Sequence, residues 1–233
     1  MKKYELTEET FTVFGKTLYR IRAVRDFGSV KTGEFGGYIE KEENLSHYGE
    51  AWVSGNAKVS GNARVSGNAK VCGNAEVCGN TKVCGNAEVC GEAWVSGEAW
   101  VCGDTKVCGN AMVSGKAKVC GNAKVCGNAM VSGKAEVCGE AKVCGNAKVC
   151  GNAEVSNTRH FFVQGPIGSR NDFVTFYRTK DDTVGVRCGC FSGSIQKFVD
   201  RVEETHGGSR YEKEYKLAAE LAKVCIRLEE VSE

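Results

Sequence analysis

Proline and histidine are nearly absent from this sequence. One Pro and three His occur among 233 residues, whereas Gly occurs 30 times. A disordered Gly-rich linker is ordinarily rich in Pro as well, so this composition argues against one. It indicates instead that Gly recurs at a fixed place in a periodic structure.

Long apolar runs and an excess of one charge are also missing. No stretch is apolar enough to span a bilayer, and the opening MKKYELTEET has no apolar run of the kind that a signal peptide needs. The formal net charge of +2 gives no argument for a membrane or a nucleic acid as the partner. We therefore expect a cytoplasmic protein that binds neither.

The dominant feature that is present is a six-residue repeat from residue 49 to residue 156. GEAWVS, GNAKVS and GNARVS begin a run of 18 repeats without insertion or deletion. Each repeat starts with Gly and has Val in fifth place, and the third place is Ala except at Thr81 and Thr105. Self-similarity this strict outweighs every other signal in the chain.

A period of six fits a short strand followed by a tight turn and does not fit a helix face. Within each repeat Ala and Val alternate with polar residues, which predicts that Ala and Val face inward. Gly and Asn adopt positive φ most easily, so the Gly-Asn pair is expected to form the corner. Three corners close a coil of about 18 residues, which predicts about six coils of parallel strands about 4.8 Å apart.

The repeats resemble those of the hexapeptide-repeat left-handed β-helix family, known from acyltransferases and γ-type carbonic anhydrases. The resemblance covers residues 49–156 and implies a left-handed coil, although most parallel crossovers are right-handed. The segment TLYRIRAVRDFGSVKTGEFGGYIEKEENLS and the tail GPIGSRNDFVTFYRTKD…GCFSGSIQKFVDRVEETHG resemble phage and prophage proteins of the transferase-like hexapeptide group. The implied fold is mainly β: a left-handed parallel β-helix of 18 hexapeptide repeats, an N-terminal β cap (1–48) and a small C-terminal α+β module (157–233).

The repeats lack the residues that the chemistry of those enzymes needs. Acyltransferases of this family use a His general base on or near a coil, and the carbonic anhydrases use three His to bind zinc. His47, His160 and His206 all lie outside residues 49–156, and no loop interrupts the repeats. We therefore favour a protein without the activity of either enzyme family and predict no cofactor. The two end modules remain as places for an active site.

Most of the 14 Cys stand in the sixth place of a repeat, where other repeats have Ser. Residues eighteen apart stack on one face, so one face is expected to carry Cys72, Cys90, Cys108, Cys126 and Cys144. Thiols about 4.8 Å apart could share a soft metal ion. Because no His or carboxylate partners them in a ligand-like pattern, we interpret them as small, stackable side chains in a reducing cytosol and predict no metal site.

Another face carries Trp94, Met112 and Met130 above the small residues Ser96, Ser114 and Ser132. An exposed apolar stripe of this kind usually marks an interface, so we predict a homo-oligomer, with a trimer favoured. The alternative is that these three large residues are scattered by drift.

The two ends have different predicted structures. Residues 1–48 predict a hairpin, followed by a turn at Gly33, Gly36 and Gly37. Residues 157–233 predict three strands and then two helices, the second beginning at Ser209. The predicted strands are Phe11–Phe14, Leu18–Ala23, Phe161–Val163, Phe173–Tyr177 and Thr183–Cys188; a hairpin turn is predicted at Thr179–Asp182, and the last helix face is Tyr215, Ala218, Leu221, Ala222, Cys225 and Leu228.

The segment from Gly165 to Asp172 predicts a Gly-rich polar loop that begins GPIGSR. Its backbone N–H groups, with Ser169, Arg170, Asn171 and Asp172, are a candidate phosphate-binding site, although the segment is not a Walker or dinucleotide motif. A plain connection between strands is the alternative. Convergence of Arg170, Asp172 and His206 in one pocket would favour an enzyme.

These features predict a non-catalytic, homo-oligomeric binding scaffold. The β-helix would be a rigid spacer and assembly surface, and an end module would bind a host protein or a small nucleotide-like ligand. The phage resemblance implies a narrower form, in which the protein acts in the host cytoplasm as counter-defence, by sequestering a nucleotide signal or blocking a host protein. Two alternatives stay open: a degenerate acyltransferase or a hydrolase using the C-terminal module, and a structural assembly protein.

Overall fold

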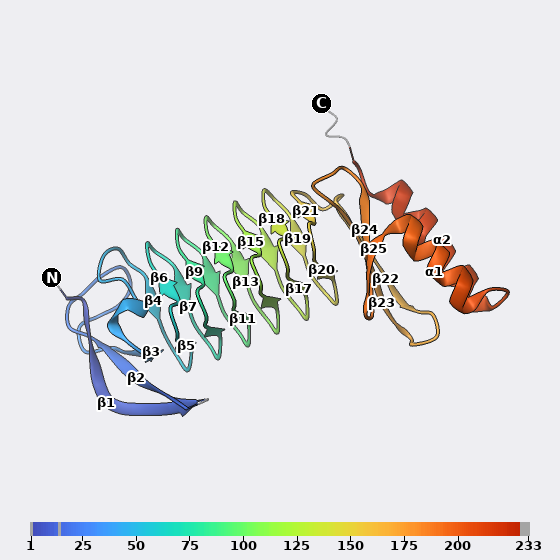
Figure 1. The fold of residues 1–233 in the computed structure, drawn as a ribbon. Coiled ribbons are helices and arrows are strands. Elements are labelled where there is room, and N and C mark those ends of the chain that lie inside the picture. Colours follow the sequence, from blue (N-terminus) through green and yellow to red (C-terminus); the bar gives the residue numbers. More distant parts are fainter. Residues whose placement is uncertain (1, 14, 229–233) are drawn as a thin grey trace.

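The alternation of inward and outward residues in each repeat produces one two-residue strand per repeat. In the computed structural model these strands stack as a row of coils between two end modules (Figure 1). The structure describes residues 2–13 and 15–228. No helix among these residues is both long and apolar enough to cross a membrane.

The coils present three faces, each a parallel sheet. The thiol face has β4 (Trp52–Val53), β7 (Lys70–Val71), β10 (Glu88–Val89), β13 (Lys106–Val107), β16 (Lys124–Val125) and β19 (Lys142–Val143). The methionine face has β5 (Lys58–Val59), β8 (Glu76–Val77), β11 (Trp94–Val95), β14 (Met112–Val113), β17 (Met130–Val131) and β20 (Lys148–Val149). The third face has β6 (Arg64–Val65), β9 (Lys82–Val83), β12 (Trp100–Val101), β15 (Lys118–Val119), β18 (Glu136–Val137) and β21 (Glu154–Val155). The predicted parallel β-solenoid is confirmed.

The solenoid core consists of the small apolar residues that each repeat turns inward. Ala93 and Val95 are 0% exposed, and the equivalent residues of the other repeats are buried to the same degree. Burial of a Val side chain stabilises the folded chain by roughly 1.5–3 kcal/mol. Each coil buries few such residues, so the stability of the solenoid comes from the number of stacked coils. The inward orientation predicted for Ala and Val is confirmed.

Each corner is formed by Gly and the residue after it, and Gly is the one that has positive φ. Gly97 has φ +74°, and a Cβ there would lie 2.9 Å from the backbone N of Gly115 in the next coil. The predicted Gly-Asn corner is confirmed as a two-residue turn. Among the described residues other than Gly, positive φ occurs at Asn171 and Asp182, so the Asn residues of these turns do not have positive φ. These Asn instead form ladders between coils; Asn62 Nδ2, for example, donates to Asn80 Oδ1 at 3.0 Å.

The N-terminal segment extends the solenoid. Strands β1 (Tyr4–Val13) and β2 (Lys16–Ala23) form a longer hairpin than predicted, with predicted residue Phe14 outside the described residues. Strand β3 (Phe35–Ile39) pairs in parallel with β5 and so joins the sheet of the methionine face. Gly36 and Gly37 lie within β3 and not in the predicted turn. A Cβ on Gly37 would approach Ala57 O to 2.5 Å, which explains the need for Gly at this position.

Side chains of this segment complete the hydrogen bonds of the first coil. The ammonium of Lys3 donates to Ala51 O at 2.6 Å, and the amide of Asn44, in the 3-10 helix η1 (Glu42–Asn44), donates to Ala63 O at 2.8 Å. Tyr4 and Ile39 are fully buried in the same cluster as the solenoid Val residues. The cap therefore continues the solenoid core.

The C-terminal module has an antiparallel sheet covered by two helices. Its elements are β22 (Phe161–Ile167), β23 (Asp172–Arg178), β24 (Val184–Cys188), β25 (Phe191–Ser194), α1 (Ile195–His206) and α2 (Arg210–Cys225). Strand β25, which contains Gly193, was not predicted. The predicted start of the last helix is confirmed, since Ser209 Oγ accepts from the Glu212 N–H at 3.3 Å.

The sheet of this module lies between the last coil and the helices (Figure 1). Along β23, Thr175 and Tyr177 face the solenoid, and Thr175 Oγ1 accepts from the Lys148 N–H at 2.9 Å. Val174 and Phe176 face the helices and belong to a separate core cluster. Leu221 is 47% exposed, so its predicted place on the buried helix face is wrong, and Ala219 is fully buried there instead.

Candidate functional site

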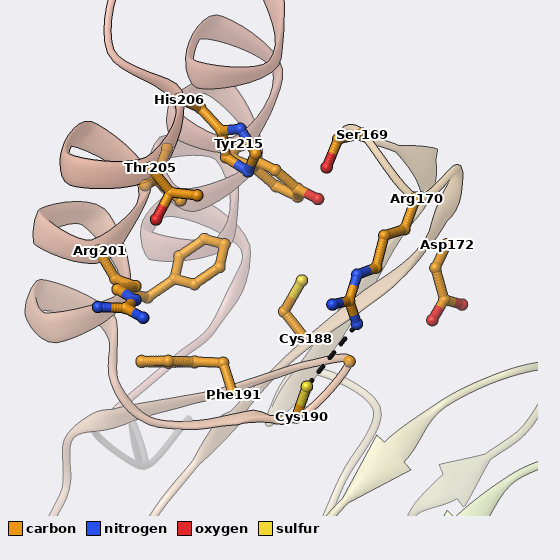
Figure 2. A pocket seen from close by; sticks show the side chains of 13 residues that line it. Ser169, Arg170, Asp172, Cys188, Cys190, Phe191, Arg201, Thr205, His206 and Tyr215 are labelled. Carbon is orange, nitrogen blue, oxygen red and sulfur yellow. Dashed lines mark hydrogen bonds between the residues drawn. The ribbon is translucent and has the colours of Figure 1, made fainter.

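A cavity of about 390 Å³ lies in the C-terminal module, between α1, α2 and the turns that join β22 to β23 and β24 to β25 (Figure 2). Three of the four residues predicted to bind a ligand, Ser169, Arg170 and Asp172, line it. Asn171 is not among the lining residues, and its φ of +49° makes it part of the turn conformation.

The predicted Gly-rich loop is a short turn, because β22 runs to Ile167 and β23 begins at Asp172. The N–H of Gly168 donates to Glu214 Oε2 at 2.7 Å, which anchors the turn to α2. The N–H of Asn171 donates to Gly168 O at 3.1 Å. Both amides are used within the protein, so side chains are the better candidates for holding a ligand at this turn.

The charged groups at the cavity are mainly cationic. Arg170 lies over the turn between β24 and β25, where its Nη1 donates to Cys190 Sγ at 3.7 Å and lowers the pKa of that exposed thiol (Figure 2). Arg201 lines the opposite wall, on α1. The Asp172 carboxylate lies 3.5 Å from Lys148 of the solenoid, and its pKa is lowered by the Phe173 N–H and by Lys148. The cavity therefore suits an anion.

Aromatic rings form the other part of the wall. The ring of Phe198 lies 5.6 Å from that of Phe191 and 5.7 Å from that of Tyr215, measured between centroids. Tyr215 is nearly buried, and burial together with Cys188 raises the pKa of its phenol to about 12, so it is neutral near pH 7. The His206 ring lies 5.7 Å from Tyr215. The Phe rings offer apolar surface, and the Tyr215 hydroxyl offers a neutral hydrogen-bonding group.

Arg170, Asp172 and His206 line the same cavity, which is the arrangement that would favour an enzyme. The sequence reasoning missed Arg201 and Cys190. Arg201 and Thr205 are four residues apart and so share one face of α1, a spacing that is visible in the sequence. Nothing in the sequence pattern places Cys190 beside Arg170.

The predicted apolar stripe lies in register on the methionine face. Trp94 pairs with Met112, and Met112 pairs with Met130, on neighbouring strands. Trp94 is 43% exposed and its Nε1 donates to Cys78 Sγ at 3.3 Å, whereas Met112 and Met130 are half-buried. Trp100 on the third face is 44% exposed and contacts Cys84 in the same way, so an exposed Trp is not unique to the stripe.

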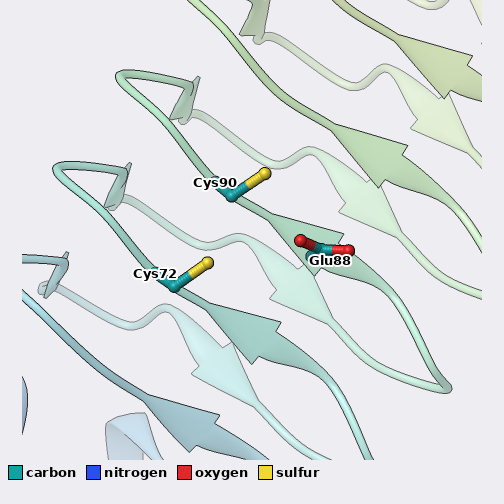
Figure 3. A group of neighbouring side chains, drawn as sticks. All are labelled: Cys72, Glu88 and Cys90. Carbon is teal, nitrogen blue, oxygen red and sulfur yellow. The ribbon is translucent and has the colours of Figure 1, made fainter.

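On the thiol face, Cys72, Cys90 and Glu88 bring two sulfurs and a carboxylate oxygen within 4.8 Å of one another (Figure 3). Glu88 lies two residues before Cys90 on the outer surface, and Cys72 occupies the equivalent position in the preceding coil. Our premise that no carboxylate accompanies the thiols is therefore wrong at Glu88.

Comparison with known proteins supports the repeat architecture. A family model described as the YdcK β-solenoid repeat matches residues 57–73, which include strands β5, β6 and β7. No curated protein matches the chain. The match and the fold together identify a β-solenoid repeat protein.

Proposed function

We propose that this protein is a non-catalytic binding scaffold whose C-terminal cavity holds a small organic anion. The observation that carries the proposal is the pairing, in one cavity, of Arg170 and Arg201 with a wall of aromatic rings. A guanidinium binds phosphate or carboxylate through two parallel N–H donors, and rings provide a surface for a flat apolar group. A nucleotide-like ligand has both parts.

The solenoid is the spacer in this proposal. It is taken as a left-handed β-helix of the hexapeptide-repeat family with 18 repeats in about six coils. Its uninterrupted coils hold the two end modules at a fixed separation, because the strands of each coil are hydrogen-bonded to those of the next coil on all three faces. The narrower phage and counter-defence function remains a prediction from the resemblance, with a nucleotide signal as one proposed ligand.

Ligand binding is tested by measuring the affinity of a panel of nucleotides by isothermal titration calorimetry. We expect Arg170→Ala and Arg201→Ala each to weaken binding by about tenfold to a hundredfold, since hydrogen bonds to charged groups contribute about 1.5–3 kcal/mol. Arg64→Ala is the matched control, because Arg64 is exposed on the third face of the solenoid and is not among the cavity's lining residues. Unchanged affinity in both cavity variants would contradict the assignment of the site.

A hydrolase in the C-terminal module is the second candidate function. It is favoured by the convergence of Arg170, Asp172 and His206 and by the lowered pKa of the Cys190 thiol. A lowered pKa increases the fraction of nucleophilic thiolate. Turnover of phosphate or ester substrates that is lost in both Cys190→Ser and His206→Ala would establish this function in place of binding alone.

We propose further that the protein forms a homo-oligomer, with a trimer favoured, in which the methionine face is the subunit interface. Met112→Lys combined with Met130→Lys should shift the mass measured by native mass spectrometry from oligomer to monomer, because two charges would enter the apolar stripe. Trp100→Lys is the control on the third face, and we expect it to leave the mass unchanged. An oligomer that survives the double substitution would exclude this face as the interface.

A further inference from the structure

A second site is suggested on the thiol face, far from the C-terminal cavity. The outward residues before the stacked thiols of this face are Lys70, Glu88, Lys106, Lys124 and Lys142, so Glu88 is the sole acid in that column of five. Because it flanks Cys90, which stacks on Cys72, the three side chains meet at one point on the surface (Figure 3). No other such group of His, Cys, Asp and Glu side chains occurs among the residues that the structure describes.

We propose that Cys72, Cys90 and Glu88 form a binding site for a thiophilic divalent cation such as Zn²⁺ or Cd²⁺. Two thiolates and one carboxylate supply three ligands, and a water molecule completes a tetrahedron, the arrangement of an open zinc site. The sulfur ligands favour a soft or borderline ion over Mg²⁺ or Ca²⁺. The three atoms, within 4.8 Å of one another, need small side-chain movements to reach a common ion.

Lys106 provides the charge that such a site requires. Its Nζ donates to Glu88 Oε2 at 3.0 Å, which leaves Oε1 available to the cation. A carboxylate held in this way by an outer partner is a common feature of metal sites. Two thiolates, one carboxylate and one divalent cation leave a single negative charge, which the Lys106 ammonium balances.

The binding equilibrium releases protons. A free Cys thiol has a pKa of about 8.5, so both side chains are mainly protonated near neutral pH without the cation. One divalent cation then replaces two protons, one from each sulfur, while Glu88 is already ionised. Affinity should therefore increase with pH.

The cation also has a route to the site. Cys72 lines a second cavity, of about 400 Å³, together with Trp52, Ser54 and Lys70. This cavity opens beside the first coils, so the thiol is accessible to a hydrated ion. Ser occupies the position of these thiols in the neighbouring repeats at Ser54, Ser60 and Ser66, which indicates that Cys→Ser substitutions will preserve the fold.

The test is a Cd²⁺ titration of the reduced, chelator-treated full chain, followed by the ultraviolet thiolate-to-cadmium absorption and by proton release. We expect one tight equivalent that releases two protons. Cys72→Ser with Cys90→Ser should abolish it, and Glu88→Gln should weaken it by about tenfold. The matched control is Cys108→Ser with Cys126→Ser, in the same column but flanked by Lys106 and Lys124.

Retention of the tight equivalent in the control pair would support the site. Equal loss in both double variants would show that the column binds cadmium without a specific site and would overturn the proposal. Absence of any tight equivalent in the unaltered protein would overturn it as well. A Glu88→Gln affinity equal to that of the unaltered protein would remove the carboxylate from the ligand set and refute the three-ligand site.

Discussion

The two ends of the solenoid are covered in different ways. At the N-terminal end, β3 joins the sheet of the methionine face, and Tyr4 and Ile39 are buried in the same cluster as the Val residues of the coils. At the C-terminal end a separate sheet lies across the last coil, with its own core around Phe176 and Phe198. A cap like the N-terminal one is enough to cover the open backbone of a terminal coil. The additional core of the second supports a cavity, which is why we place the binding function there.

The largest expected effects come from placing a carboxylate in each of the two cores. Ile39→Asp and Val186→Asp each bury an unpaired charge at a fully buried position, at a cost of about 3–5 kcal/mol. We expect Ile39→Asp to increase hydrogen exchange in the cap and in the first coils together. Val186→Asp should increase exchange between residues 161 and 225 and leave the solenoid strands protected. Equal exposure of the solenoid by both variants would show that the two cores unfold as one.

A smaller and pH-dependent effect is expected at Lys3, which donates to carbonyl groups of the first coil. Lys3→Met should lower the free energy of unfolding by about 1–3 kcal/mol at pH 7, because buried carbonyl groups lose their donor. Burial and Arg25 lower the pKa of the Lys3 ammonium to about 8.

Between pH 8 and pH 10.5 the unfolded chain therefore holds a proton on Lys3 that the folded chain has lost. Stability of the unaltered protein should rise with pH across this window, relative to Lys3→Met, and the difference should be constant below it. Denaturant unfolding of both proteins from pH 7 to pH 10 measures this difference. A fall in place of the rise would refute the lowered pKa.

The smallest effect is expected at the ion pair that joins the C-terminal module to the third face. Lys180 Nζ lies 2.7 Å from Glu136 Oε1, and both side chains are partly exposed. Lys180→Gln should destabilise the module by less than about 1 kcal/mol, and the difference should shrink in high salt. Lys116→Gln, which removes a pair with Glu98 within the solenoid, is the control. An effect as large as that of Val186→Asp would mean that this contact anchors the whole module.

The solenoid could be predicted because each of its features repeats. Val in fifth place and Gly in first place specify an inward residue and a corner, and the structure repeats these at every coil. The grouping of Glu88 with Cys72 could also have been found, by applying the eighteen-residue register to both outward columns. The cavity could not, because Arg170, Arg201 and Tyr215 come from a turn and two helices whose packing no periodicity describes.

The exact register of the coils has a consequence for how the gene can change. Trp94 pairs with Met112, eighteen residues on, so loss or gain of three repeats by recombination would shorten or lengthen the rod by one coil, about 4.8 Å, and keep every column intact. Loss or gain of one repeat would instead shift all later residues to the next face and turn the C-terminal module by about a third of a revolution relative to the cap. Natural length variants that keep both the thiol face and the methionine face should therefore differ in steps of three repeats.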